Sequence, residues 1–489
     1  MKKGEENYLH KIMKKILIYN WIPFDETEGK GGGVSVYTKN LIRHLVKRSD
    51  WEVYFLSSGR AYDIRKRKTF IEPTENIFGE ECKSYQIVNS PVLSSAHLSF
   101  SSPWLCYEDT VLKEVIKKFF REIGDFDVVH FQNLEGLSLK VLELKEEFPK
   151  TKFIYSLHNY YPFCPQVMLW KENLENCQEK TGGECCISCM PKDVHRRKVI
   201  FNQWINYQKK REEKIRPVWS GLQNVMESVY GIYDKLTGGK ICVRRKIKLS
   251  RAFQRFRKEM VFYLNKYMDD ILAVSHRTAE IATFYGVEKE KVRISYIGSE
   301  VAEIQKGNEA YPYDGGLFHI CYLGYMRRVK GFHFLIEALE KMPSHLAVKL
   351  KLTLAVQIRE DEMKKRITDL KKKLTEIVIY DGYNHDDLPE ILKEVQLGIV
   401  PHLWEDNLPQ VAIEMKAYGI PVLVSDLGGA RELTLSNDFC FVGGDIDDFL
   451  KKLSVFLRYP EKLNNYWKNA SKLPTMGEHI EELMSYYEE

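Results

Sequence analysis

The amino-acid sequence predicts an α/β protein with two doubly wound, Rossmann-like domains and a cleft between them. The chain has 489 residues, whereas a single compact domain usually holds ~100–200. Hydrophobic residues make up 44% of the chain, enough to bury two cores. Two separate series of short apolar segments alternate with amphipathic stretches, a pattern typical of parallel sheets covered by helices on both faces.

The first series occupies the amino-terminal half. Its apolar segments have the length and the β-branched and aromatic content of strands; they are residues 15–19, 51–56, 128–131 and 153–157. Between the first two, apolar side chains recur at helical spacing, which predicts a helix over residues 34–47.

The second series begins near residue 317. Strands are expected at 318–323, 349–356, 377–380, 397–400 and 422–425, and helices at 331–341, 361–374, near Leu388 and from Pro409. Residues 308–316 are rich in Pro, Gly and Tyr and are the expected linker. We therefore predict an N-terminal domain over 1–307, a C-terminal domain over 308–460, and terminal helices over 461–489 that pack back on the N-terminal domain.

The charge of the chain is concentrated in one insertion of the first domain. The whole chain has a net charge of +5, but residues 192–258 hold 19 Lys and Arg against five Asp and Glu. Such a segment suits an anionic partner, which could be a lipid surface, a phosphorylated acceptor or a nucleic acid. No nucleic-acid-binding module is recognisable, so we expect no nucleic-acid partner.

Within this basic insertion, about residues 192–265, residues 251–257 have the pattern of a basic amphipathic helix that could lie on an anionic bilayer. The alternative is a helical insertion with a solvated basic face. No apolar run reaches the ~18 residues of a membrane-spanning helix, and the charged N-terminus lacks the apolar stretch of a secretory signal. We expect a cytoplasmic protein, either free or attached peripherally to the inner face of the cell membrane.

The loop after the fourth strand of the second series is the strongest candidate for chemistry. Pro409 suits the first turn of a helix, so the amides of Leu408, Gln410 and Val411 would lie near the helix end. Such an end attracts anionic groups, including a diphosphate. Glu414, more than a turn inside, could accept hydrogen bonds from the vicinal hydroxyls of a ribose or hexose. The alternative is an ordinary capping Asp406 with a surface Glu414.

These residues resemble the nucleotide-sugar glycosyltransferases of family 4, which have the GT-B fold. Asp406 and Glu414 match the carboxylate-x7-Glu motif of that family. Five further matches follow the family's order: Gly31–Gly33, His158–Pro162, Leu272–Ser275, Gly324–Gly331 and Ser425–Glu432. Each motif alone is weak, but six in order cover most of the chain outside the basic insertion.

The resemblance implies a catalytic role for four residues. Lys330 is expected to bind the donor diphosphate, Asp406 to contact the donor sugar, Glu414 to hold the ribose, and His158 to lie near the reaction centre. Without the other motifs, Lys330 would be interpreted as a solvated surface residue and His158 as a structural histidine.

The donor-binding set implied by the resemblance is larger. Tyr325 stands where the family has an arginine, and either Arg327 or Arg328 could replace that arginine. Glycines without a Cβ allow the backbone to approach the donor or the acceptor closely. The full expected set is Gly32, Gly33, Arg327, Arg328, Lys330, Asp406, Asn407, Leu408, Gln410, Val411 and Glu414.

The function implied is retaining transfer of a sugar from a UDP- or GDP-sugar to a glycan or lipid-linked glycan, as in surface polysaccharide assembly. No metal is expected at the chemical step. A member of a different kind, a catalytically silent binding or scaffold subunit, is the main alternative, because Asp406 and Tyr325 depart from the family pattern. A GT-B enzyme of other chemistry, such as a sugar-nucleotide epimerase, is the third.

The cysteines are also unevenly placed. Cys164, Cys177, Cys186 and Cys189 fall in one loop, 164–189, and the last two have the spacing of a zinc chelate. Cys185 is an alternative to Cys186 in this set. Similar cysteines follow the histidine motif in some of the resembling enzymes. A structural zinc ion is expected, with an iron–sulfur cluster or free thiols as alternatives.

Overall fold

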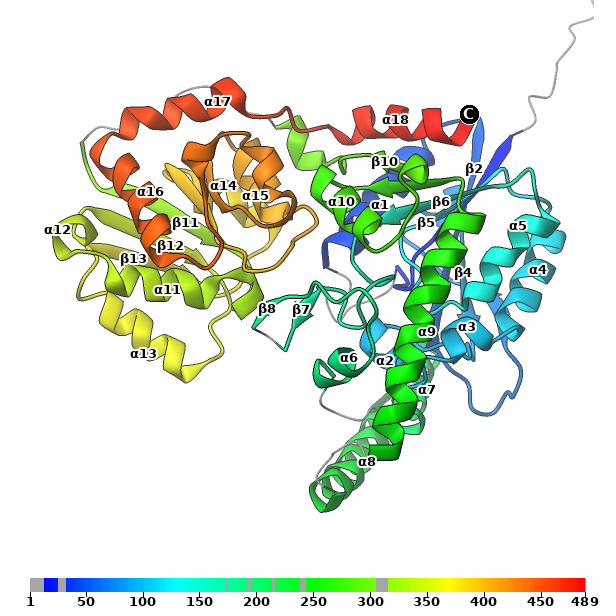
Figure 1. Ribbon diagram of the computed structural model, residues 1–489. Coiled ribbons are helices and arrows are strands. Elements are labelled where there is room, and N and C mark those ends of the chain that lie inside the picture. Colours follow the sequence, from blue (N-terminus) through cyan, green and yellow to red (C-terminus); the bar gives the residue numbers. More distant parts are fainter. Residues whose placement is uncertain are drawn as a thin grey trace, which may run out of the picture. The chain divides into compact units, whose positions relative to one another are not determined.

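The computed structural model describes residues 13–24, 32–172, 174–190, 195–212, 216–237, 243–304 and 315–488. It forms two compact units: residues 1–157, 181–272 and 483–489 make the first, and residues 158–180 and 273–482 make the second. Each unit contains a sheet with covering helices (Figure 1), so the predicted α/β class is confirmed. Most of the expected linker at 308–316 lies outside the described residues.

The sheet of the first unit is wound in both directions from its first strand. β1 (Lys14–Tyr19) pairs in parallel with both β2 (Trp51–Ala61) and β5 (Val128–Phe131). The strands run in the order β9-β6-β5-β1-β2-β4-β3. The others are β6 (Lys152–Leu157), β9 (Asp270–Ala273), β4 (Cys82–Val88) and the antiparallel edge strand β3 (Phe70–Pro73). Because the order reverses beside β1, the helix that follows β1 begins where such sheets bind ligands.

Helices α1 (Gly32–Leu45) and α4 (Val111–Ile123) pack against strands of this sheet. The first unit also contains the short helices α2 (Ala96–Ser99), α3 (Leu105–Glu108), α5 (Leu144–Glu147) and α6 (Glu184–Ser188). The predicted helix at 34–47 is therefore present but begins and ends two residues earlier.

The basic insertion forms three helices, α7 (Arg196–Arg211), α8 (Arg216–Thr237) and α9 (Val243–Tyr267). The aromatic residues of the expected amphipathic segment 251–257 are buried, because Phe253 and Phe256 pack on Phe100 with ring centroids 5.3 and 4.9 Å apart. This face of α9 belongs to the core and is not available to a bilayer.

The end of α18 (Met476–Glu488) completes the first unit. The buried ring of Tyr487 contacts Trp51, and its hydroxyl lies 2.6 Å from Nδ1 of His130 in β5. Glu488 accepts a hydrogen bond from Lys14 at 3.0 Å. The first unit thus depends on residues from both ends of the described chain.

The sheet of the second unit is parallel, with the order β13-β12-β11-β14-β15-β16. Its strands are β11 (Phe318–Leu323), β12 (Leu350–Ala355), β13 (Glu376–Tyr380), β14 (Leu397–Val400), β15 (Val422–Ser425) and β16 (Cys440–Phe441). The first five were predicted within one residue at each end. The order reverses between β11 and β14.

The helices of the second unit alternate with these strands. They are α11 (Phe332–Lys341), α12 (Ser344–Ala347), α13 (Asp361–Leu370), α14 (Leu388–Leu392), α15 (Gln410–Ala417), α16 (Ile446–Arg458) and α17 (Asn465–Asn469). α10 (His276–Phe284), the short strand β10 (Val292–Ile294) and the two-residue strands β7 (Trp170–Lys171) and β8 (Glu175–Asn176) also belong to this unit. In the part of the chain that the structure describes, every helix is too short or too polar to cross a bilayer.

A buried histidine in β11 makes the stability of the second unit depend on pH. The side chain of His319 lies 2.8 Å from Oγ1 of Thr353 and 3.0 Å from the carbonyl of Glu394. Burial, aided by Lys351, lowers the pKa of His319 to about 4. The histidine is neutral in the fold but takes up a proton when unfolded below pH 6.5, so stability is complete above pH 6.5 and is lost toward pH 4.

We expect this histidine to account for about 3 kcal/mol of acid destabilisation between pH 6.5 and 4. Urea unfolding at several pH values measures it. The variant His319→Gln should show a smaller loss of unfolding free energy over this range, whereas the exposed-histidine control His345→Gln should follow the wild type. Equal slopes for all three proteins would contradict the assignment.

Candidate active site

The loops after β11 and β14 meet at the point where the strand order of the second unit reverses. Residues 324–331 follow β11, and residues 401–409 follow β14, which is its parallel neighbour. In doubly wound sheets, ligands bind beyond the carboxyl ends of the strands at this switch point. The predicted site residues of the second unit lie largely on these two loops.

Lys330 and Asp406 connect the two loops. Nζ of Lys330 lies 2.6 Å from Oδ2 of Asp406, and Nδ1 of buried His402 lies 2.9 Å from the same oxygen. Burial would raise the pKa of the Asp406 carboxyl, but the charge of Lys330 and the contact with His402 outweigh burial and hold this pKa below its usual range. Asp406 is therefore a carboxylate that orients the ammonium group of Lys330.

The Lys330 ammonium also lies over the indole ring of Trp404, 5.2 Å from its centroid. The Trp404 side chain is buried, and its Nε1 has no hydrogen-bond partner among the described residues. The lysine side chain itself keeps 27% of its surface exposed. A cation fixed on a ring and a carboxylate, yet open to solvent, is suited to bind an anionic ligand.

Gly331 allows the two loops to approach each other. Its φ is +75°, and a Cβ built on it would lie 1.7 Å from the carbonyl oxygen of Pro401. The loops are also joined by a hydrogen bond of 2.9 Å from the amide of Leu403 to the carbonyl of Val329. The position of Lys330 relative to Asp406 thus depends on a residue without a side chain.

The N-terminus of α15 follows Asp406 directly. Pro409 precedes the helix, and no side chain caps it, so the first amides remain available to a ligand. Gln410 and Val411 are half-buried. Asn407 and Leu408 are buried; the side-chain amide of Asn407 lies 3.4 Å from Oγ1 of Thr278, so it supports the loop.

Glu414, in the second turn of α15, has one oxygen held and one unpartnered. Oε1 lies 3.1 Å from Nε2 of His385, and this contact raises the pKa of His385 despite partial burial. Oε2 is buried and has no hydrogen-bond partner among the described residues. A buried carboxylate oxygen without a partner is free to accept a hydrogen bond from a ligand that enters the site.

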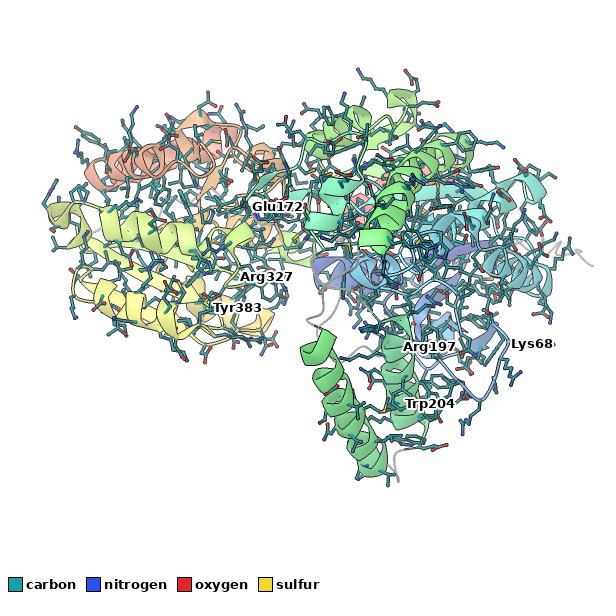
Figure 2. The ribbon with its side chains drawn as sticks, turned by 60° about the horizontal axis from the view of Figure 1, so that its bottom comes forward. Lys68, Glu172, Arg197, Trp204, Arg327 and Tyr383 are labelled. Carbon is teal, nitrogen blue, oxygen red and sulfur yellow. The ribbon has the colours of Figure 1, made fainter. Side chains whose placement is uncertain are left out.

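Lys330 and Glu414 lie at the same edge of the sheet. Tyr383, in the loop after β13, is close enough to Glu414 and to Tyr325 for both to raise the pKa of its hydroxyl, after the larger effect of burial. Tyr325 belongs to the loop that carries Lys330. Figure 2 labels Arg327 and Tyr383, which stand on these two loops.

Arg327 and Arg328 are both exposed. The guanidinium of Arg327 lies 5.6 Å from the ring centroid of Tyr325, the residue that stands in place of the family arginine. The roles of Arg327 and Arg328 as donor ligands stay predictions.

A second charged pair holds the loop that carries Asp406. Arg277 at the start of α10 donates to both oxygens of Glu405, at 2.6 and 3.0 Å. Glu405 also accepts the amide hydrogen of Gly428 at 2.8 Å. The amide of Gly429 in turn donates to the carbonyl of Asp406 at 2.8 Å. This arrangement fixes the backbone on both sides of Asp406.

Arg277, His385, His402, Trp404 and Glu405 were not in the predicted site. His402, Trp404 and Glu405 had a signal, because they are polar or aromatic residues directly after an apolar strand and next to Asp406. Arg277 and His385 lie far from Asp406 and Glu414 in the sequence, and only the fold brings them to these carboxylates.

His158 follows β6 and belongs to the second unit. Burial, with a smaller effect of His479, lowers the pKa of His158 to about 3, so this imidazole is neutral. Gly32 and Gly33 open α1 in the first unit and are exposed. The expected roles of these three residues stay predictions.

The predicted zinc site is not supported. Across the described ranges, His, Cys, Asp and Glu side chains form no group of three or more that could hold a metal ion. Cys164 and Cys177 belong to the second unit, and Cys186 and Cys189 to the first. Cys186 instead lies 3.9 Å from Nη2 of the buried Arg257.

Two family models match consecutive parts of the chain. Glycosyltransferase Family 4 matches residues 31–181, and Glycosyl transferases group 1 matches residues 306–473. Two doubly wound units are the architecture of the GT-B fold, which the solved structures below share. The chain belongs to the family 4, group 1 glycosyltransferases of this fold.

Solved structures of the same fold match nearly the whole chain. HepE of Anabaena, solved in complex with UDP, superposes with a TM-score of 0.55 at 12% identity and covers 97% of this chain and 99% of its own. Sucrose-phosphate synthase from Thermosynechococcus elongatus gives a TM-score of 0.55 at 15% identity, covering 97% and 98%.

A curated relative matches only in part. The D-inositol 3-phosphate glycosyltransferase of Pseudarthrobacter chlorophenolicus is 22% identical over 169 residues, which are 32% of this chain. The match spans about two fifths, 40%, of the length of that relative.

Proposed function

We propose that this protein transfers a sugar, with retention of the anomeric configuration, from a UDP- or GDP-sugar to a glycan or lipid-linked glycan acceptor. The observation that carries the proposal is a fixed ammonium group and an unpartnered carboxylate oxygen at one edge of the second sheet. Lys330 supplies the first, beside an uncapped helix end, and Glu414 supplies the second. A nucleoside diphosphate has the matching groups, namely an anionic diphosphate and a ribose with two hydroxyls.

Each group then has a physical task. The departing diphosphate gains negative charge as the bond to the sugar breaks, and Lys330 with the first amides of α15 would stabilise that charge. Glu414 would accept hydrogen bonds from the ribose through Oε2 while His385 keeps Oε1 in place. Asp406 is engaged by Lys330 and His402, so we assign it mainly to positioning the lysine.

The chemical step proposed for this site uses no protein nucleophile and no metal ion. The acceptor hydroxyl approaches the face that the nucleotide leaves, and a donor phosphate oxygen takes its proton. A role in surface polysaccharide assembly at the inner face of the membrane is supported by the basic insertion at residues 192–258, which suits an anionic surface.

Nucleotide binding by purified protein tests the proposal first. UDP or GDP at 100 times its Kd should stabilise the wild type by ~2.7 kcal/mol in a thermal-shift assay. Replacing Glu414 with Gln should raise the Kd about 10–100-fold, because a hydrogen bond to a charged group contributes about 1.5–3 kcal/mol. Glu362→Gln, an exposed-carboxylate control on α13, should bind as the wild type does.

Turnover then separates this function from the alternatives. The proposal requires release of the nucleoside diphosphate that depends on a glycan acceptor, with the product bond in the same anomeric form as the donor. A scaffold subunit would release no nucleotide from any donor. An epimerase would convert the donor sugar without an acceptor, and either result would overturn the proposal.

A further inference from the structure

α8 carries an exposed apolar stripe, which we define as Val218, Leu222, Val225 and Val229. Their exposed fractions are 67%, 38%, 60% and 53%. Spacings of four, three and four residues place these side chains on one face of the helix. Isolated exposed apolar residues are ordinary on protein surfaces, but four in register on one helix are not.

A neighbouring face of α8 already has its partner. Trp219 packs on Trp204 of α7, with ring centroids 5.2 Å apart, and Gln223 accepts a hydrogen bond from Lys209 of α7 at 2.6 Å. Trp204 and Arg197, both on α7, are labelled in Figure 2. Packing on α7 therefore leaves the α8 stripe exposed in the part of the molecule that the structure describes.

Exposed, positively charged side chains lie near the α8 stripe along the chain. Lys210 and Arg211 end α7, and Arg216 begins α8, two residues before the stripe; all three are exposed. The same combination recurs at the start of α9, where Ile247 is 51% exposed between the exposed Lys246 and Lys248. Residues 192–258 as a whole have 14 more positive than negative side chains.

This combination of features selects one kind of partner. A second copy of the chain would bring the same excess of positive charge, so its approach would be opposed. A nucleic acid would neutralise the positive charge, but its phosphates would not bury the apolar side chains of the α8 stripe. An anionic bilayer satisfies both, because acyl chains cover the stripe and the headgroups neutralise the cations.

We infer that α8 lies on an anionic membrane surface, with the α8 stripe turned toward the acyl chains. The inference rests on the proposed function, in which the acceptor is a glycan at the membrane, and it names the segment that makes the contact. The membrane-contacting segment is therefore α8 and not residues 251–257, as the sequence had suggested. The phenylalanines of residues 251–257 are buried in the core of the first unit.

Vesicle flotation of the full-length protein tests the inference. Wild type should float with vesicles of phosphatidylcholine and 30% phosphatidylglycerol, and not with phosphatidylcholine alone. Leu222→Asp with Val225→Asp should reduce the partition coefficient about tenfold or more, because charges replace side chains that enter the interface. The control Val348→Asp, at an exposed valine of the second unit, should float as the wild type does.

A gain-of-binding variant keeps the test decisive if the aspartates unfold α8. Leu222→Phe with Val225→Phe adds apolar area and should increase the partition coefficient several-fold. Equal flotation of the wild type and both double variants would overturn the inference. The inference would also be overturned if the substitutions changed only the oligomeric state, measured by light scattering. UDP and GDP thermal shifts on the same proteins report separately on the proposed function, since α8 lies outside the nucleotide site.

Discussion

Replacing Lys330 with Met is expected to lower sugar-transfer turnover about 10²–10³-fold, the usual effect of removing one fixed group that stabilises developing charge. The ammonium lies on Asp406 and Trp404 at the switch point and keeps part of its surface open. Methionine has a similar length and is uncharged, so the diphosphate would lose its cation while the packing on Trp404 is largely retained. Steady-state release of nucleoside diphosphate measures the effect.

The same substitution leaves the Asp406 carboxylate buried without its cation, which could lower stability by itself. The double variant Lys330→Met with Asp406→Asn removes both charges and should recover stability in urea unfolding without recovering turnover. Lys372→Met on the surface near α13 is the matched control, since its side chain is 76% exposed. Wild-type turnover in the Lys330→Met protein would contradict the proposed site.

Gly331→Ala is expected to destabilise the second unit by about 2–5 kcal/mol. A left-handed backbone costs a residue with a Cβ roughly 1–2 kcal/mol, and overpacking adds about 1–3 kcal/mol. The new methyl group would meet the carbonyl of Pro401 at 1.7 Å, and backbone on both sides prevents a cheap rearrangement. Urea unfolding gives the stability change.

Turnover should fall as well, because separating the two loops separates Lys330 from Asp406. Gly477→Ala is the control: that glycine lies in α18, and an added Cβ would meet nothing nearer than 4.0 Å. Alanine there should be neutral or stabilise by about 0.5–1 kcal/mol. Equal free energies of unfolding for the two alanine variants would contradict the prediction that the close approach at Gly331 excludes a Cβ.

The buried strands of the second unit could be predicted from sequence because helices cover both faces of the sheet. Each strand is therefore an uninterrupted run of apolar residues. β14 and β15 have the predicted bounds, 397–400 and 422–425, and are buried throughout. β4 was missed because Cys82–Val88 mixes buried and exposed side chains without a regular alternation. β16 has two residues and exists only because β15 offers it a partner.

The site was predictable to the extent that it is local in sequence. Asp406 and Glu414 share one loop and helix, and Lys330 lies before a glycine at a helix start, so motif spacing indicated all three. The contact of Glu414 in α15 with His385 joins residues 29 positions apart, and that of Glu405 with Arg277 spans 128 positions. Such pairs are determined by the strand order and by the packing of the loops, and neither can be derived from a single sequence.

The association of Tyr487 and Glu488 with the first unit has a practical consequence for dissecting the protein. Neither unit is one continuous piece of chain, so a single cut cannot release either of them intact. A fragment ending at Leu272 would leave Trp51 and His130 without their tyrosine. During synthesis the ribosome must therefore have delivered Tyr487 before the first unit can close its core around Trp51 and His130.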